Sequence, residues 1–181
     1  MEIKRITQAE WLPKVSDSIY NSKYRILYGV VETPVAIVHR KTQVDEEVCQ
    51  KYNYTIIESF NNGGTILSNE GDFLIAHFGQ LGNNWRTHFT NYFTNWLRNK
   101  GLNVSFTEND ILVDGYKVCG TCVTRYGNVD YSGVAIGLNT KLEHIKAICR
   151  KPMNKVPRGL YDYDITTEEI EQMFLEFCNT I

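Results

Sequence analysis

The segment from Asn109 to Gly120 gathers an amide, carboxylates, an amine and a thiol around one expected tight turn. Asp114-Gly115 is a dipeptide that type I′ hairpin turns favour, so two antiparallel strands are expected on either side of it. Lys117 follows this turn directly. A lysine in such a place is usually exposed to solvent, so residue type and position alone assign Lys117 no chemical role.

The motifs around this hairpin resemble one enzyme family. The hairpin reads Asn109-Asp110-Ile111-Leu112-Val113-Asp114-Gly115-Tyr116-Lys117-Val118-Cys119-Gly120. It is similar to the N-D-hydrophobic-x-V-x-G-x-K-hydrophobic-x-G hairpin of lipoate-protein ligases and related octanoyltransferases. Residues 62–73 resemble the family's R-R-x-S-G-G-G-A-V-Y-H-D-x-G-N-L segment, and residues 155–160 its S-V-x-S-R-V-x-N-L stretch. The resemblance runs from about Tyr24 to the end, and order and spacing give it more weight than any single piece.

The resemblance implies an acyl transfer. In that family ATP activates a carboxylic acid to an acyl-adenylate, and the acyl group then passes to a lysine of an acceptor domain. Glycines let the backbone approach the acyl chain and the phosphate, and a lysine between carbonyl and phosphate favours the charge that develops there. Carried over by motif position, the expected catalytic residue is Lys117. The expected substrate and nucleotide contacts are Gly63, Gly64, Thr65, Asn109, Asp110 and Gly120, with Asp110 also as a magnesium ligand. Lipoate or octanoate is the expected acid, ATP and magnesium the expected cofactors, and a lipoyl acceptor domain the expected partner.

Several positions depart from the family pattern. Glu58 and Ser59 stand where the family has an arginine pair that holds phosphates, and a like charge about 4 Å from a phosphate repels it by roughly 1 to 4 kcal/mol. Asn61 and Asn62 replace the first two residues of the S-G-G-G signature. The stretch Tyr131-Ser132-Gly133-Val134 falls where the family usually has a histidine. A second hypothesis is therefore a catalytically inactive relative that binds a ligand or a partner.

The cysteines raise a third hypothesis. The octanoyltransferase branch uses a cysteine thioester in a loop after the helix that follows the meander, and Cys149 lies near that place, beside Arg150 and Lys151, which would favour the thiolate. The register does not match that branch's N-P-C-G motif, which favours a plain cysteine at a helix end. Cys119 and Cys122 form a C-x-x-C. Residues three apart in a strand point to opposite faces, so these thiols cannot chelate one ion unless a bulge intervenes.

The elements that must position these residues follow hydrophobic periodicity and capping signals. Helices are expected from the Thr7-x-x-Glu10 capping box, after Thr42, over 84–100, over 142–149 from a Thr140-x-x-Glu143 box, and over about 168–178 from a Thr166-x-x-Glu169 box. Strands are expected over 24–31 and 35–38, joined by a turn, over 55–58 and 72–78, and as an antiparallel meander over 103–107, 111–113, 117–125 and 129–138. This order predicts an α+β domain with a mostly antiparallel sheet flanked by helices. The resemblance narrows it to the class II synthetase-like catalytic domain of biotin and lipoate protein ligases.

Composition sets the remaining expectations. The 181 residues are 43% hydrophobic and 22% charged, as in ordinary globular proteins, and no linker divides them, so one domain over 1–181 without an accessory C-terminal domain is expected. A net charge of -2 gives no general case for nucleic acid. No apolar run approaches the roughly 20 residues of a membrane span. Five cysteines without framework spacing fit a reducing compartment, so a cytoplasmic protein is expected.

Overall fold

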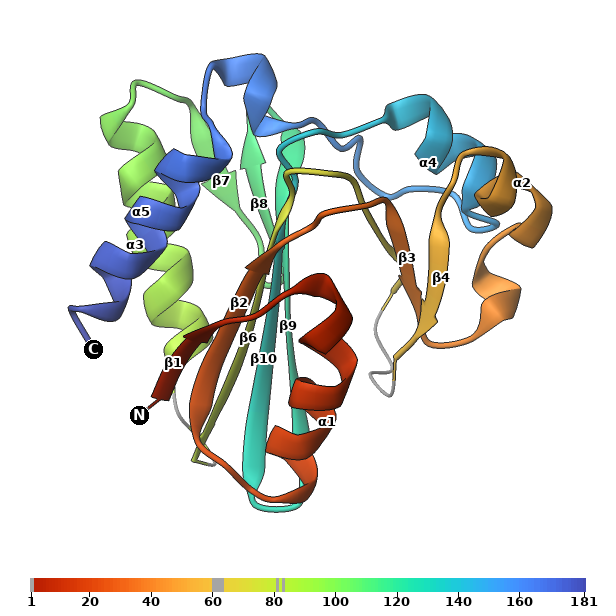
Figure 1. The fold of residues 1–181 in the computed structure, drawn as a ribbon. Coiled ribbons are helices and arrows are strands. Elements are labelled where there is room, and N and C mark those ends of the chain that lie inside the picture. The colour runs from red at the N-terminus through yellow and green to blue at the C-terminus, as the bar shows by residue number, and fades with distance from the viewer. Residues whose placement is uncertain (1, 60–63, 81, 83) are drawn as a thin grey trace.

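A seven-stranded sheet forms the centre of the computed structural model, and a three-stranded sheet stands beside it (Figure 1). The structure describes residues 2–59, 64–80, 82 and 84–181. Neighbouring strands of the large sheet are antiparallel except for β1 and β2, which are parallel. In spatial order the large sheet contains β1 (Glu2–Arg5), β2 (Arg25–Val30), β6 (Phe73–Gln80), β10 (Val129–Ile136), β9 (Tyr116–Tyr126), β8 (Asp110–Val113) and β7 (Val104–Phe106). The small sheet contains β4 (Thr55–Glu58), β3 (Val35–Val38) and β5 (Ile66–Ser68).

Helices cover both faces of the large sheet. Figure 1 shows α3 (Trp85–Asn99) and α5 (Thr167–Cys178) on one face and α1 (Trp11–Tyr20) on the other. Two short helices, α2 (Glu46–Lys51) and α4 (Leu142–Ile148), lie on the outer side of the small sheet. Short 3-10 turns occupy Gln8–Glu10, Lys41–Gln43 and Leu160–Tyr163. Among the described residues, no helix is long and apolar enough to cross a bilayer.

The main core lies between the large sheet and the α3/α5 pair. The aromatic stripe of α3 meets aromatic residues of α5, and Phe89, Phe93, Phe174 and Phe177 are almost completely buried. Burying a phenylalanine side chain contributes about 1.5 to 3 kcal/mol, so this interface holds both helices on the sheet. The aromatic stripe of α3 is therefore core.

Most of the expected elements are confirmed, including the α+β class, the meander and the helix over 84–100. Gly101 follows α3 with φ +83°, as expected for a glycine that ends a helix. The expected capping box of α5 is present, because the Thr166 hydroxyl accepts from the Glu169 N–H and the Glu169 carboxylate accepts from the Thr166 N–H.

The strands β2 and β3 follow one another across a turn, as expected, and they belong to different sheets. One expectation on local structure was wrong. The capping box expected at Thr140 does not form, and Lys141 is the residue that precedes α4. A tertiary contact fixes how the chain enters this helix, since the buried Asp72 carboxylate accepts from the backbone N–H groups of Leu138 and Asn139 at 2.7 and 2.9 Å.

Candidate functional site

A β-bulge in the predicted hairpin determines where Lys117 points. The turn at Asp114 and Gly115 has positive φ at both residues, +50° and +82°, as a type I′ turn requires. Beyond it Lys117 pairs with Leu112, but Cys119 pairs with Ile111, so Val118 is an extra residue in β9.

The bulge changes the face on which Lys117 lies. In a regular strand Lys117 and Gly120 would face opposite sides of the sheet, because they are three residues apart. The extra residue brings them to the same face. The Lys117 side chain then runs over Gly120, where an added Cβ would come within 3.2 Å of Nζ.

Asp110 faces this lysine from the neighbouring strand. It is paired with Gly120 across the β8–β9 ladder, and its Oδ1 lies 2.7 Å from Lys117 Nζ. Its other oxygen, Oδ2, lies 2.8 Å from the Nζ of Lys155. Partial burial alone would raise the pKa of Asp110, but the hydrogen bonds from the two lysines lower it below its usual value. Asp110 is therefore a carboxylate that two ammonium groups share.

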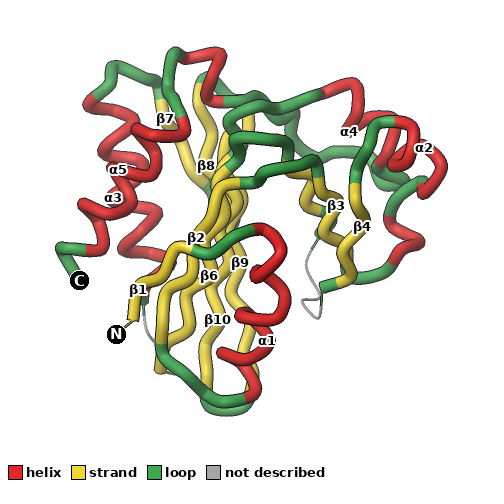
Figure 2. The backbone as a smooth tube through the Cα atoms, viewed as in Figure 1, coloured by secondary structure: helices red, strands yellow, loops and turns green. Residues whose placement is uncertain are grey.

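The segment between α4 and the last 3-10 turn brings Lys155 to this place. It runs as a loop from the small sheet back to the large one (Figure 2). The Lys117 N–H donates to the Val156 carbonyl at 2.9 Å, and the Arg158 N–H donates to the Lys117 carbonyl at 3.0 Å. The loop is thus hydrogen-bonded to the backbone on both sides of Lys117. The Arg158 guanidinium stacks on the Tyr116 ring at 3.6 Å.

The structure brings together only part of the expected site. Lys117, Asp110 and Gly120 lie together, and Asn109 is adjacent, with its side-chain oxygen accepting from Arg86 at 3.0 Å. Gly64 and Thr65 precede β5, and a Cβ at Gly64 would meet nothing within 4 Å. Gly63, like Asn61 and Asn62, lies outside the described residues. Lys155 was missed, and its only sequence signal was its place in the third family-like motif.

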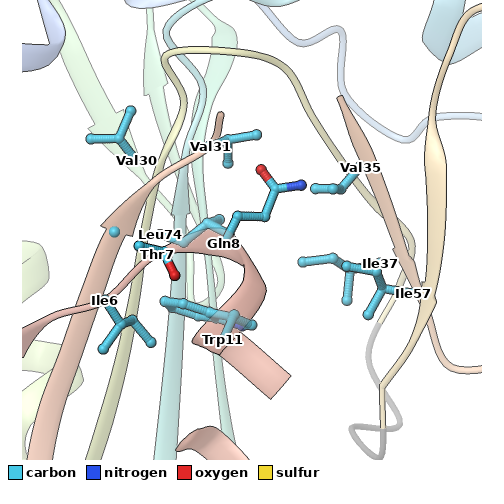
Figure 3. Close-up of a pocket in the computed structure, with 11 residues that line it drawn as sticks. Ile6, Thr7, Gln8, Trp11, Val30, Val31, Val35, Ile37, Ile57 and Leu74 are labelled. Carbon is cyan, nitrogen blue, oxygen red and sulfur yellow. The ribbon is translucent and has the colours of Figure 1, made fainter. Parts of the chain in front are cut away.

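An apolar space between the two sheets lies on the same face of the large sheet as this polar cluster, two strands away. Gly120, Ala135, Leu74 and Gly29 are paired in one row across β9, β10, β6 and β2 and so share a face. Leu74 and Gly29 help to line a cavity of about 20 Å³ between the large sheet, α1 and the small sheet. Figure 3 shows Trp11, Val35, Ile37 and Ile57 around the same space. With strands about 4.8 Å apart, Leu74 lies roughly 10 Å from Gly120 along this row.

The cysteines do not form a second metal-binding or reactive site. As expected, Cys119 and Cys122 lie on opposite faces, because Cys119 belongs to the core under α3 and Cys122 packs against the residues near α1. Burial raises the pKa of Cys119 to about 12. Burial also raises the pKa of the Cys149 thiol, which disfavours its thiolate.

The residues at Asp110 do not fit magnesium held by the protein. Magnesium prefers an octahedron of oxygen ligands that includes one or two carboxylates. Both oxygens of Asp110 instead contact ammonium groups, and no group of three His, Cys, Asp or Glu side chains suited to a metal occurs among the described residues. The assignment of magnesium to Asp110 stays a sequence-based prediction.

Comparison with known proteins identifies the family. The model of the lipoyl protein ligase A/B catalytic domain matches residues 14–176 of this chain. The chain belongs to that family. A search of curated protein sequences finds no significant match.

Solved structures of lipoyl protein ligases share this fold. A bipartite lipoate protein ligase from Thermoplasma acidophilum, described with its E2 lipoyl domain, superposes with a TM-score of 0.79 at 14% identity, over 97% of this chain and 81% of that one. LipL1 of P. falciparum in complex with lipoate gives 0.79 at 12% identity, over 98% and 60%. A biotin-bound biotin protein ligase from Aquifex aeolicus gives 0.56 at 13% identity, over 99% and 69%. The expected biotin and lipoate protein ligase fold is therefore confirmed.

Proposed function

We propose that this lipoyl protein ligase A/B family member transfers lipoate or a related acid to a lysine of a lipoyl acceptor domain, through an acyl-adenylate made with ATP. The observation that carries the proposal is the placement of the Lys117 ammonium group over Gly120, beside Asp110 and open to solvent, with 39% of its side chain exposed. Related ligases are described with lipoic acid and with ATP bound, which supports the choice of substrates.

Lys117 would act on the reacting carbonyl. An ammonium group beside an acyl-adenylate carbonyl donates a hydrogen bond that strengthens as the acceptor amine attacks and negative charge grows on the oxygen. The amine nitrogen of the acceptor lysine forms a bond to the carbonyl carbon, the C–O bond to AMP breaks and AMP leaves with its electron pair, and the proton lost from the nitrogen passes to solvent, which leaves the acyl group in an amide. Gly120 contributes by its missing side chain, because it lets the Lys117 amine pack closely over the strand.

The apolar space between the sheets would take the acyl chain. Its lining is almost wholly hydrophobic, with Leu74, Ile37 and Ile57 on two sides. The row of paired residues from Gly120 to Leu74 connects it with Lys117 over a length comparable with that of a medium-chain acyl group. Its volume of about 20 Å³ holds one water molecule, so binding an acid requires the two sheets or the side chains between them to move apart.

A catalytically inactive relative is the second candidate, and Glu58 favours it. Glu58 is the last residue of β4, and its carboxylate lies 3.8 Å from Lys41. A carboxylate at this end of the small sheet opposes a phosphate there. This candidate predicts the fold without ATP binding in calorimetry.

The test is acyl transfer by the purified chain. A lipoyl acceptor domain is incubated with the protein, ATP, magnesium and lipoate or octanoate, and its mass is measured. We expect an increase equal to the mass of the acid minus one water, because the acyl group replaces one hydrogen of the acceptor amine. No increase with any acid, also when the preformed acyl-adenylate is supplied, would remove the proposed function. Transfer from the preformed adenylate alone would remove only the ATP-dependent first step.

A further inference from the structure

Two lysine ammonium groups contact the Asp110 carboxylate, although a single positive charge would neutralise it. Lys155 Nζ lies 2.8 Å from Asp110 Oδ2 and 3.1 Å from the Thr107 hydroxyl, and Lys117 Nζ lies 2.7 Å from Oδ1. Two positive charges and one negative charge leave this cluster with a net charge of about +1. The cluster therefore attracts an anion.

The two amines are accessible to such an anion. Lys155 and Lys117 expose 29% and 39% of their side chains, whereas Asp110 exposes only 19%. The carboxylate lies deeper than the amines, and each amine has further N–H groups to donate. An incoming anion meets the ammonium groups first.

Asp110 also explains how two like charges stay close together. Two ammonium groups brought to one place repel each other. The Asp110 carboxylate contacts both of them, and its attraction offsets this repulsion before any ligand is bound. The lowered pKa of Asp110 keeps the carboxylate ionised at neutral pH.

The backbone holds Lys155 in place independently of its side-chain contacts. The carbonyl of Val156, the next residue, accepts from Lys117 N–H, and Pro157 forms an isolated parallel bridge with Lys117. Lys155 is thus attached to the same strand that carries Lys117, and it is not a freely mobile surface lysine.

We propose that Lys155 is a second anion-binding residue of this site, which together with Lys117 holds the phosphate group of the acyl-adenylate, while Asp110 keeps the two amines side by side. This inference rests on the proposed function and adds a residue to it. A phosphodiester carries one negative charge, which matches the net charge of the cluster. Both oxygens of Asp110 contact ammonium groups, so Asp110 is not available to a metal ion. The two lysines instead supply the positive charge at this point.

Binding of two stable adenylate mimics tests the inference. One is an adenosine joined to an octyl chain through a phosphodiester, and the other carries a neutral sulfone in place of that linkage. Calorimetry compares the unaltered chain with Lys155→Ala, Lys155→Arg and the control Lys151→Ala, an exposed lysine of the same loop. We expect Lys155→Ala to weaken phosphodiester binding about 10-fold or more, as loss of a hydrogen bond to a charged group does. Sulfone binding should change less than twofold, Lys155→Arg should retain most of the affinity, and Lys151→Ala should match the unaltered chain.

Each other outcome has a definite meaning. Equal losses for both mimics show a merely structural role for Lys155 and overturn the inference, as does an unchanged affinity for the phosphodiester. In both cases the proposed function stands if the unaltered chain binds the mimics and transfers acyl groups. If the unaltered chain binds neither mimic, the proposed function falls together with the inference. Thermal unfolding of each variant shows whether the fold is kept.

Discussion

The Lys117 ammonium group packs over Gly120, next to the position that a Cβ would take at this residue. A methyl group at 120 would come within 3.2 Å of Nζ and 3.3 Å of Cε, so the flexible end of Lys117 would have to move. We expect Gly120→Ala to lower acyl transfer by up to about 10-fold, because the amine must shift slightly and a misplacement of about 1 Å costs about 100-fold.

The stability of this variant should change little, because the displaced atoms are the end of a partly exposed side chain. Transfer rates and melting temperatures are compared with those of Val123→Ala, a change at an exposed position of the same strand. Unaltered transfer by Gly120→Ala would show that the position of the Lys117 amine is unimportant.

His77 makes the fold sensitive to acid. It is buried in β6, stacks on Trp85 at 4.6 Å, and its Nδ1 has no hydrogen-bond partner among the described residues. Burial lowers its pKa from 6.5 to about 4, against the opposing charge of Asp130. Between these values the unfolded chain binds a proton on His77 that the folded chain does not, so the contribution of His77 to stability is full above pH 6.5 and is lost towards pH 4. The buried Asp72 carboxyl, whose pKa burial raises to about 6, changes stability in the opposite direction over part of this range.

The expected loss from His77 is about 3 kcal/mol at 1.36 kcal/mol per pKa unit. Urea unfolding at about pH 7.0, 5.5 and 4.5 measures this loss in the free energy of unfolding. His77→Phe keeps an aromatic ring beside Trp85 and should flatten this part of the pH dependence. His88→Gln, at an exposed position of α3, should leave it unchanged. An equal slope in His77→Phe and the unaltered chain would contradict the assignment.

Gly159 holds the loop that carries Lys155 against the large sheet. A Cβ there would collide with the backbone of Leu138 and Thr140, which cannot move aside as a side chain can. We expect Gly159→Ala to destabilise the fold by about 1 to 3 kcal/mol, the usual cost of overpacking, and to lower acyl transfer by displacing Lys155. Chemical denaturation measures the first effect. Lys151→Ala in the same loop should leave the free energy of unfolding unchanged. Equal stability of the two variants would show that the backbone of Leu138 and Thr140 accommodates the added methyl group.

Cys149 should not carry the acyl group. Burial raises its pKa, so little thiolate is present at neutral pH. Cys149→Ser should transfer acyl groups within about twofold of the unaltered chain, whereas loss of a covalent nucleophile costs many orders of magnitude. Mass spectrometry of the protein after incubation with the acid and ATP adds a direct check. An acyl adduct on Cys149 would establish the thioester route.

Local patterns were sufficient for much of the fold. The period of the apolar residues from Trp85 to Leu97 predicted α3, because a helix buries one face. Asp114-Gly115 predicted the hairpin, because only a few dipeptides adopt the backbone of a type I′ turn. Both features depend on neighbours in sequence.

Features that depend on distant residues were not predictable in this way. The bulge at Val118 fixes the face on which Lys117 lies, yet no residue type marks it. Lys155 meets Asp110 across 45 residues of sequence, through a loop that has no regular structure of its own. The turn after β2 was recognised, but the assignment of β3 to a second sheet is decided by packing across the chain.

The central claim, that acyl transfer occurs at Lys117, is tested most directly by supplying preformed lipoyl-adenylate and an acceptor domain. This removes any dependence on the activation step. The initial rate of acceptor mass gain is compared for the unaltered chain, Lys117→Met and the control Lys146→Ala, whose lysine pairs with Glu143 on α4. We predict a loss of about 100-fold or more for Lys117→Met, the usual effect of removing a group that stabilises developing charge, and no loss for Lys146→Ala. A folded Lys117→Met variant that transfers at the unaltered rate would contradict the claim.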